Sequence, residues 1–133
     1  MNISSSYIKK CIYELEELTE KDRPYTRLVF SKEFKEARNW LTNQFKNLDL
    51  DIKIDNAGNL IGIYKSFNKS SKKVLIGSHL DTVPFGGRFD GIAGVVSSLA
   101  IVKNFREKNI ELPFDVELYD YLGEELNDWG MSC

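Results

Sequence analysis

The chain has 133 residues, 42% of them hydrophobic and 29% charged, and its formal net charge is −2. These values predict a globular chain with one hydrophobic core and argue against intrinsic disorder. Basic and acidic residues are interspersed and no apolar run is long enough to span a bilayer, which argues against nucleic-acid and membrane partners. Cys11 and Cys133 lack metal or redox spacing and the N-terminus lacks a secretory signal, so we expect free thiols and a cytoplasmic protein.

Two helices and a hairpin are predicted in the first half of the chain. Ser4 to Ser6 provide caps for a helix whose apolar residues recur at three- and four-residue spacing up to about residue 20. Ser31 is the expected cap of a second helix, whose apolar face runs from Phe34 to Leu48. The β-rich runs 50–54 and 60–64 flank an Asn/Gly turn, so they predict a β-hairpin.

A strand–helix–strand unit is predicted in the second half. The apolar run at 73–78 predicts a short buried strand, and the segment from Asp90 to about Phe105 predicts a helix that is apolar nearly all round. Residues 114–118 alternate as a second strand does. This order predicts a parallel strand pair in an α/β fold. Residues 123–133 contain no predicted element, so we expect further chain to complete the fold.

The only histidine of the chain, His79, directly follows the predicted strand 73–78. Ligands of open α/β sheets bind outside the carboxyl ends of strands, which is where this residue is expected. On its own, a histidine in such a place is more often structural than a ligand. Asp81 favours the ligand interpretation, because its carboxylate can accept a proton from the imidazole and leave the other ring nitrogen for a metal.

Three further acidic residues are candidates for the same site. Asp90 has an alternative role as a helix N-cap, and capping is compatible with metal binding. The Gly86-Gly87 pair allows a tight loop that returns Asp90 towards the histidine. Glu124 and Glu125 follow the next predicted strand, so they are expected to face the same crevice, where one residue binds metal and the other handles a proton.

Two other chemistries fit the sequence less well. A thiol nucleophile formed by Cys133 with His79 would lack an orienting helix N-terminus or loop behind the cysteine. A phosphate site at Gly86-Gly87 would lack both the Walker lysine and the GxGxxG pattern. A hydrolytic metal site therefore remains the leading interpretation.

The chemistry-bearing residues resemble a known superfamily, the zinc-dependent amidohydrolases and exopeptidases that include aminoacylase, carboxypeptidase G and acetylornithine deacetylase. The branch most similar is that of N-carbamoyl-L-amino-acid hydrolase, β-ureidopropionase and allantoate amidohydrolase. The resemblance runs from about Thr26 to Cys133. Its specific part, followed by Glu124-Glu125 downstream, is His79-x-Asp81-Thr82-Val83-x-x-Gly86-Gly87-x-Phe89-Asp90-Gly91. Supporting matches are Thr26-Arg27-Leu28 and Asp55-Asn56-Ala57-Gly58-Asn59-Leu60.

The resemblance implies a role for each matching residue. His79 would bind one metal ion, Asp90 would bridge two, and Glu125 would bind the other. Glu124 would be the general base for the metal-bound water, and Asp81 would be the partner that orients His79. The implied cofactors are two divalent ions, with zinc as the first expectation and manganese, cobalt or nickel as alternatives.

The resemblance also implies a fold and a reaction. We expect a three-layer, zinc-exopeptidase-like mixed sheet flanked by helices, with residues 1–133 as the N-terminal part of the catalytic domain and without the lid domain. The reaction would be hydrolysis of a linear amide or carbamoyl C–N bond in a small molecule. The partners would be that substrate and the missing C-terminal portion, and full-length relatives would be homodimers.

Two departures from the family pattern shape these expectations. The carbamoylase branch follows its Glu-Glu pair with a segment containing Arg-Phe, whereas this chain has Leu126-Asn127-Asp128-Trp129-Gly130. Family members are also much longer, and their remaining metal ligands lie beyond this chain. We therefore expect the isolated chain to be inactive, and the alternative is a non-catalytic binding fragment or one half of a split enzyme.

Overall fold

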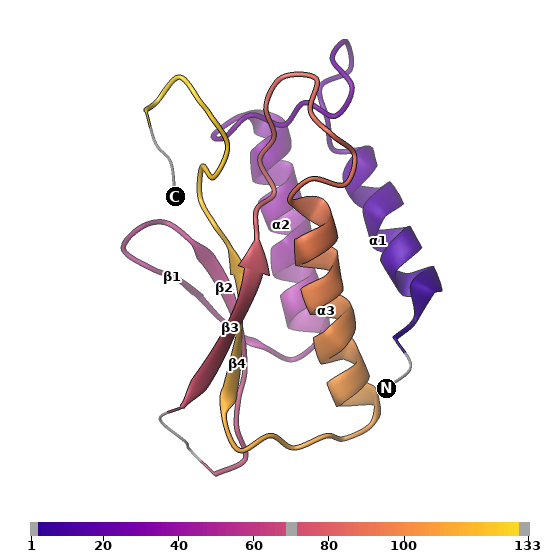
Figure 1. The fold of residues 1–133 in the computed structure, drawn as a ribbon, viewed down its shortest axis with the longest axis vertical. Helices are drawn as coiled ribbons and strands as arrows, with labels where there is room; N and C mark the ends of the chain where they lie inside the picture. The colour runs from indigo at the N-terminus through magenta and orange to yellow at the C-terminus, as the bar shows by residue number, and fades with distance from the viewer. Residues whose placement is uncertain (1–2, 69–71, 131–133) are drawn as a thin grey trace.

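The computed structural model describes residues 3–68 and 72–130, which form four strands and three helices. Figure 1 shows the sheet on one side, α3 beside it, and α1 on the side of α3 away from the sheet. In chain order the elements are α1 (Ser5–Glu16), α2 (Lys32–Asn47), β1 (Asp51–Ile54), β2 (Leu60–Tyr64), β3 (Lys73–Ser78), α3 (Ile92–Glu107) and β4 (Asp115–Asp120).

The four strands form one mixed sheet in the order β1-β2-β4-β3. β1 pairs with β2, and β2 with β4, in antiparallel register, whereas β3 and β4 run parallel with Ser78 opposite Asp120. This confirms the predicted hairpin, the predicted strand–helix–strand unit and the mixed α/β sheet with flanking helices. Parallel pairing matters for function because it brings the carboxyl ends of β3 and β4 to the same edge of the sheet.

Helices cover one face of this sheet. α2 packs against β1 and β2, α3 packs against β3 and β4, and α1 packs against α3. Gly62 of β2 and Leu118 of β4 lie side by side on this face, where Gly62 contacts the Phe45 ring closely and Leu118 is 1% exposed. Of the three layers that the family resemblance implies, the described residues contain the sheet and the helices on one of its faces.

The predicted caps of the first two helices are confirmed. The Ser4 hydroxyl accepts a hydrogen bond from the Tyr7 backbone N–H, and the Ser31 hydroxyl accepts one from that of Phe34. Such contacts satisfy backbone donors that have no partner inside a helix. α1 ends at Glu16, earlier than the residue 20 that the apolar spacing predicts.

The start of α3 differs from the sequence prediction. Gly91, with φ 66°, is the N-cap residue of α3, and this cap makes no side-chain hydrogen bond. The interpretation of Asp90 as the helix cap is therefore wrong, and its carboxylate is not used for capping. The prediction that α3 is buried on several sides is confirmed by Val96, Leu99 and Val102, each at 0% exposure between the sheet and α1.

Two composition-based expectations have outcomes in the structure. Cys11 is a free, buried thiol, whereas Cys133 lies outside the described residues. Within residues 3–68 and 72–130, no helix combines the length and the apolar character that crossing a membrane requires.

Candidate metal centre

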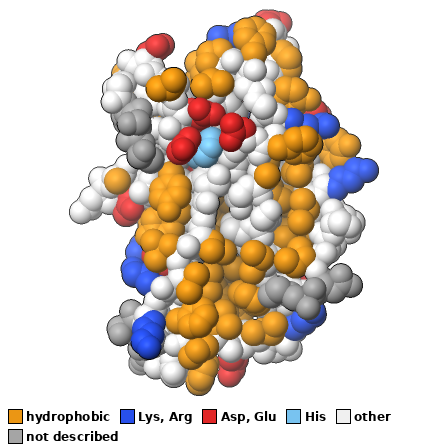
Figure 2. Space-filling view, viewed as in Figure 1, with side chains coloured by type: hydrophobic (Ala, Val, Ile, Leu, Met, Phe, Trp, Pro, Cys, Tyr) orange, Lys and Arg blue, Asp and Glu red, His pale blue; other side chains and the backbone are white. Residues whose placement is uncertain are grey.

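The candidate site lies at the sheet edge where β3 and β4 end together. His79 is the first residue after β3, and Glu124 and Glu125 follow β4 within five residues of Asp120. The loop between β3 and α3 brings Asp90 to the same place. On the surface in Figure 2, the single histidine is surrounded by acidic side chains. This edge is the usual position of a ligand site in an open α/β sheet.

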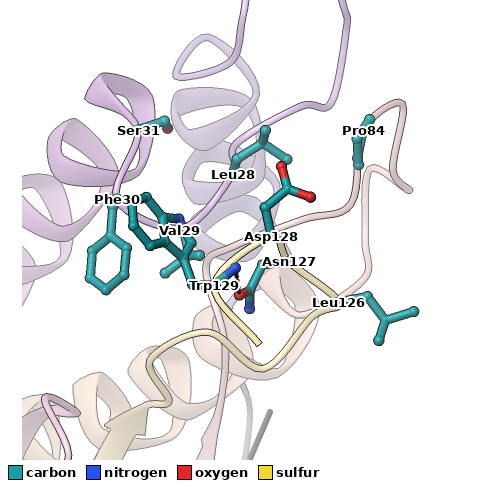
Figure 3. Close-up of a pocket in the computed structure, with 9 residues that line it drawn as sticks. All are labelled: Leu28, Val29, Phe30, Ser31, Pro84, Leu126, Asn127, Asp128 and Trp129. Carbon is teal, nitrogen blue, oxygen red and sulfur yellow. Dashed lines mark hydrogen bonds between the residues drawn. The ribbon is translucent and has the colours of Figure 1, made fainter. Parts of the chain in front are cut away.

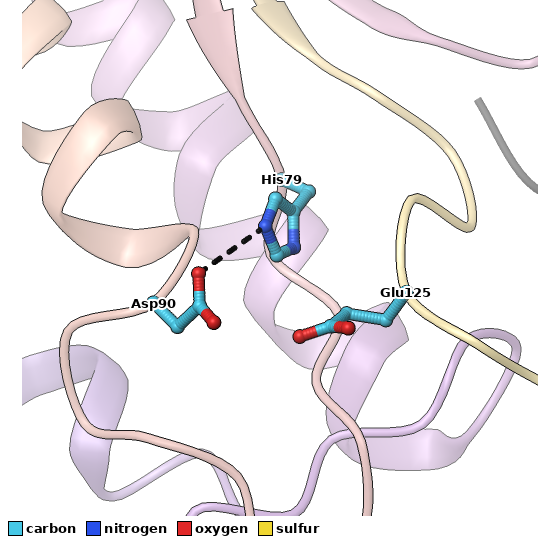
Figure 4. A group of neighbouring side chains, drawn as sticks. All are labelled: His79, Asp90 and Glu125. Atoms are coloured by element: carbon cyan, nitrogen blue, oxygen red, sulfur yellow. Dashed lines mark ion pairs between the residues drawn. The ribbon is translucent and has the colours of Figure 1, made fainter.

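Three side chains converge here with suitable ligand atoms. One ring nitrogen of His79 and one carboxylate oxygen each from Asp90 and Glu125 all lie within 4.8 Å of one another (Figure 4). The Nε2 atom of His79 is 3.8 Å from Oδ1 of Asp90 and 3.4 Å from Oε2 of Glu124. The histidine side chain is 8% exposed, whereas those of Asp90 and Glu124 are 69% and 44% exposed. The histidine therefore lies at the buried bottom of the cluster, and the carboxylates of Asp90 and Glu124 lie at its exposed rim.

Asp81 is 1% exposed and lies close to the His79 ring. Its backbone carbonyl is 3.0 Å from Nδ1 of His79, and its carboxylate Oδ1 is 3.6 Å from the same nitrogen. The other carboxylate oxygen, Oδ2, accepts a hydrogen bond from the backbone N–H of Glu125. Among the described residues, Oδ1 has no hydrogen-bond partner. Asp81 thus ties the two strand ends together and keeps one buried acceptor beside the ring.

Two buried charged residues, Arg27 and Asp120, fix the turn after His79 through separate contacts to Leu80, and the sequence did not predict these contacts. The Leu80 backbone N–H donates to Oδ1 of Asp120, and the Leu80 carbonyl accepts from Nε of Arg27. Arg27 is 2% exposed and also donates to the carbonyls of Leu15 and Leu18. Burial lowers the pKa of Arg27 to about 10, so it stays charged at neutral pH. The Thr26-Arg27-Leu28 match pointed to this segment but not to its contact with the site.

Gly91 is a second residue whose role sequence reasoning missed. A Cβ atom at this position would lie 2.3 Å from the His79 carbonyl oxygen and 2.7 Å from two atoms of the imidazole ring. Its φ of +66° is also a conformation that favours glycine. Glycine is therefore required here because the backbone passes directly against the histidine. In the sequence, the signal for this close packing is the glycine that directly follows Asp90.

Replacing Gly91 with alanine should destabilise the chain by at least about 2 kcal/mol, because the methyl group adds a steric clash to the strain of a positive φ. Thermal and urea unfolding measure this loss. Gly87→Ala is the matched control, since a Cβ atom there has its nearest neighbour at 3.7 Å. Equal unfolding free energies for the two variants would contradict the packing of Gly91 against His79.

Electrostatics in the cluster favour a protonated histidine when no cation is bound. Burial works to lower the pKa of His79, but the carboxylate and carbonyl of Asp81, together with Glu124, outweigh it and raise the pKa to about 9. Burial is the main cause that raises the pKa of Glu125. His79 works in the opposite direction, and Asp90 and Glu124 add to the increase. The excess of carboxylates over cations here is what a site for a positive ion requires.

The segment after Glu125 forms one wall of a pocket of about 310 Å³ (Figure 3). The opposite wall is formed by residues 28–31, and the Trp129 ring packs edge-on against the Phe30 ring with centroids 5.7 Å apart. Asn127 donates from its side chain to the Glu125 carbonyl and accepts from the Trp129 backbone N–H. These contacts order the segment that replaces the Arg-Phe of the carbamoylase branch.

Comparison with known proteins identifies relatives among the amidohydrolases. The chain is 34% identical over 126 residues to N-carbamoyl-L-amino-acid amidohydrolase of a Pseudomonas species, covering 94% of this chain and 30% of the relative. It is 27% identical to ureidoglycolate hydrolase of rice over 132 residues, covering 98% of this chain and 27% of the relative. The structure matches a hydantoinase/carbamoylase family amidase of Burkholderia ambifaria with a TM-score of 0.86 and 26% identity, covering 92% of this chain and 31% of the other. No protein-family model matches.

The structure thus has the mixed α/β fold found in part of a hydantoinase/carbamoylase family amidase, with a candidate metal site at the edge where β3 and β4 end. Its sequence and fold are similar to those of the hydantoinase/carbamoylase amidohydrolases, as the sequence resemblance predicted. The chain spans about 30% of the length of these curated relatives, all of which are named as hydrolases.

Proposed function

We propose that this chain supplies part of the dinuclear metal centre of an amidohydrolase, with His79, Asp90 and Glu125 as metal ligands. The observation that carries the proposal is the convergence of these three ligand atoms within 4.8 Å. One imidazole and two carboxylates form a donor set that divalent zinc accepts, with manganese, cobalt and nickel as alternatives. Asp90 has two carboxylate oxygens on an exposed side chain, which suits it to bridge two ions.

The surroundings of the histidine support the fit of a metal. A metal-bound histidine normally donates its other ring N–H to a carboxylate or carbonyl group. Asp81 offers both groups beside Nδ1, including the Oδ1 atom that has no hydrogen-bond partner among the described residues. Nδ1 would thus be occupied by Asp81, leaving Nε2 directed towards Asp90 and Glu124.

The proposed chemistry divides the work among these residues. When bound, the metal ions would acidify a water molecule and polarise the scissile carbonyl group. Glu124, with a carboxylate that is 44% exposed at the rim, would accept the proton of the attacking water and deliver it to the leaving nitrogen. Asp81 would hold the His79 ring in one orientation, and Asp120 with Arg27 would hold the turn that carries both residues.

The substrate class follows from the relatives rather than from the pocket. We propose hydrolysis of a carbamoyl or amide C–N bond in a small N-carbamoyl or N-acyl compound, because the relatives are named as N-carbamoyl-L-amino-acid amidohydrolase and allantoate amidohydrolase. We also propose that residues 1–133 correspond to the N-terminal part of the relatives' catalytic domain, working with the rest of such a fold in the cytoplasm.

Zinc titration of the chain by calorimetry tests the proposed ligands. We expect weak binding, because three side chains make up only part of the ligand set of two ions. His79→Ala, Asp90→Asn and Glu125→Gln should each weaken zinc binding by more than about tenfold. Tenfold is the lower end of the loss caused by removing a residue that only supports a metal ligand, and these three residues are proposed as ligands themselves. Asp128→Asn, which removes an exposed acid near the same loop, is the control and should bind as the parent does.

Two results would overturn this proposal. Equal zinc affinity in the parent and in the three ligand variants would show that zinc binds elsewhere. Absence of any zinc binding by the folded chain would leave the cluster without its proposed ligand and would favour a non-catalytic binding role.

A further inference from the structure

The loop that joins β3 to α3 carries both His79 and Asp90, and its two halves are held differently. In the first half, the Thr82 backbone N–H donates to the Arg27 carbonyl, and the Phe85 backbone N–H donates to the Thr26 hydroxyl. These contacts anchor the loop to the segment that precedes α2. They end before Gly86-Gly87, so they do not by themselves fix the position of Asp90.

The second half of the loop is held by Arg88. Its Nε atom donates to Oε2 of Glu16 at 3.0 Å, and its Nη2 atom donates to the same oxygen. The Tyr25 hydroxyl donates to the other carboxylate oxygen of Glu16 at 3.0 Å. The guanidinium group of Arg88 also lies over the Tyr13 ring, 5.0 Å from its centroid. One arginine thus connects the loop to the C-terminal end of α1.

This ion pair differs from the ordinary surface pairs of the chain. The side chains of Arg88 and Glu16 are 31% and 22% exposed, whereas those of Lys10 and Glu14 in α1 are 70% and 37% exposed. Arg88 lowers the pKa of Glu16, so the carboxylate stays ionised well below neutral pH. An arginine that donates from two of its nitrogens to one carboxylate fixes the relative position of the two side chains better than a flexible lysine pair does.

The contact between Arg88 and Glu16 lies close to a proposed metal ligand. Asp90 is two residues from Arg88, and its exposed carboxylate has the His79 ring as its ion-pair partner at 3.8 Å. The adjoining Gly86-Gly87 pair is conformationally permissive, so this part of the loop gains little stiffness from its own sequence.

On the other side of Asp90, the start of α3 fixes the backbone, because the Asp90 carbonyl accepts from the Ile92 N–H and the Phe89 carbonyl from the Ala93 N–H. Arg88 holds the chain that leads into Asp90 to α1.

We propose that Arg88, held by Glu16 and Tyr25, is a positioning residue that sets the Asp90 carboxylate for metal binding. The inference rests on the proposed function, since it assumes that Asp90 is a metal ligand. By this inference α1, which carries none of the proposed metal ligands, helps to position one of them.

Charge and position predict opposite effects for Arg88, which makes the proposal easy to test. Removing a positive charge near a cation site strengthens cation binding if only the electrostatic field matters. If Arg88 instead holds Asp90 in place, its removal weakens zinc binding, because the metal must then order the Asp90 carboxylate itself. Glu16→Gln removes a negative charge and so weakens binding on both accounts.

The experiment is a zinc titration of the full chain by calorimetry, in the Arg88→Ala, Glu16→Gln and Arg88→Ala/Glu16→Gln variants. We expect each single variant to bind zinc about tenfold more weakly. This is the lower end of the loss of metal affinity caused by mutating a residue that supports a metal ligand. The double variant should lose no more than either single variant. Lys10→Ala is the matched control, because it removes a positive charge from an exposed pair on the same helix.

A second arm repeats Arg88→Ala in the Asp90→Asn background. If the arginine acts through Asp90, its removal should leave the residual zinc affinity of Asp90→Asn unchanged, whereas a general structural role lowers the affinity in both backgrounds. Stronger or unchanged zinc binding by Arg88→Ala in the parent, or an equal loss in both backgrounds, would overturn the inference. Zinc binding by the parent that is independent of Asp90 would instead overturn the proposed function.

Discussion

A hybrid amidohydrolase that carries this chain should lose about 10²–10⁴-fold of its kcat when Glu124 is replaced by glutamine, the usual contribution of a general acid–base group. The hybrid is made by exchanging the matching 126-residue segment of the Pseudomonas N-carbamoyl-L-amino-acid amidohydrolase for this chain. Glutamine keeps the size of the side chain but cannot accept the proton of the attacking water. The assay follows hydrolysis of an N-carbamoyl amino acid by the metal-loaded hybrid.

The metal content of the hybrid is the control for this prediction. Because Glu124 is proposed as a base and not as a ligand, the glutamine variant should hold as much metal as the parent hybrid. Asp128→Asn in the neighbouring loop should keep its kcat. Turnover by the Glu124→Gln hybrid at the parent rate would show that another group accepts the proton.

The metal-free chain should lose about 3 kcal/mol of stability as the pH rises from about 6.5 to above 9, because of His79 alone. The folded state binds the histidine proton more tightly than the unfolded state, since the pKa is 6.5 for an ordinary histidine and about 9 in this site. The extra stability is fully present below pH 6.5, where both states are protonated. It is lost as the pH passes the folded-state value.

Urea unfolding at a series of pH values in the presence of a chelator measures this slope. His79→Gln is the control, because a side chain that does not titrate should remove the slope between pH 6.5 and 9 that the parent shows. Stability of the parent that is flat or rising across this interval would contradict a histidine held protonated by Asp81 and Glu124.

The sequence was sufficient to predict most of the elements because the local signals were strong and agreed with one another. Ser4 and Ser31 stand just before runs with helical spacing, and both cap the helices as expected. The apolar run before His79 forms β3 as predicted, but the prediction that this strand is buried is wrong, because β3 lies at the edge of the described sheet and Val74 and Leu75 are 43% and 49% exposed. The order of strand, helix and strand then required a parallel pair, which β3 and β4 form.

The parts of the site that could not be predicted depend on contacts between residues far apart in the chain. Arg27 and Leu80 are 53 residues apart, and Arg88 and Glu16 are 72 residues apart. No local spacing reports such pairs. Capping, the alternative role considered for Asp90 because aspartate is a favoured N-cap residue, is wrong, since Gly91 is the N-cap residue of α3 and packs tightly against His79.

Anomalous X-ray diffraction from crystals of the chain soaked in a zinc salt, with data collected on both sides of the zinc absorption edge, would locate a metal ion directly. We predict an anomalous peak within coordination distance of Nε2 of His79 and of carboxylate oxygens of Asp90 and Glu125. Zinc bound only at other side chains, with this cluster free of anomalous density, would contradict this prediction.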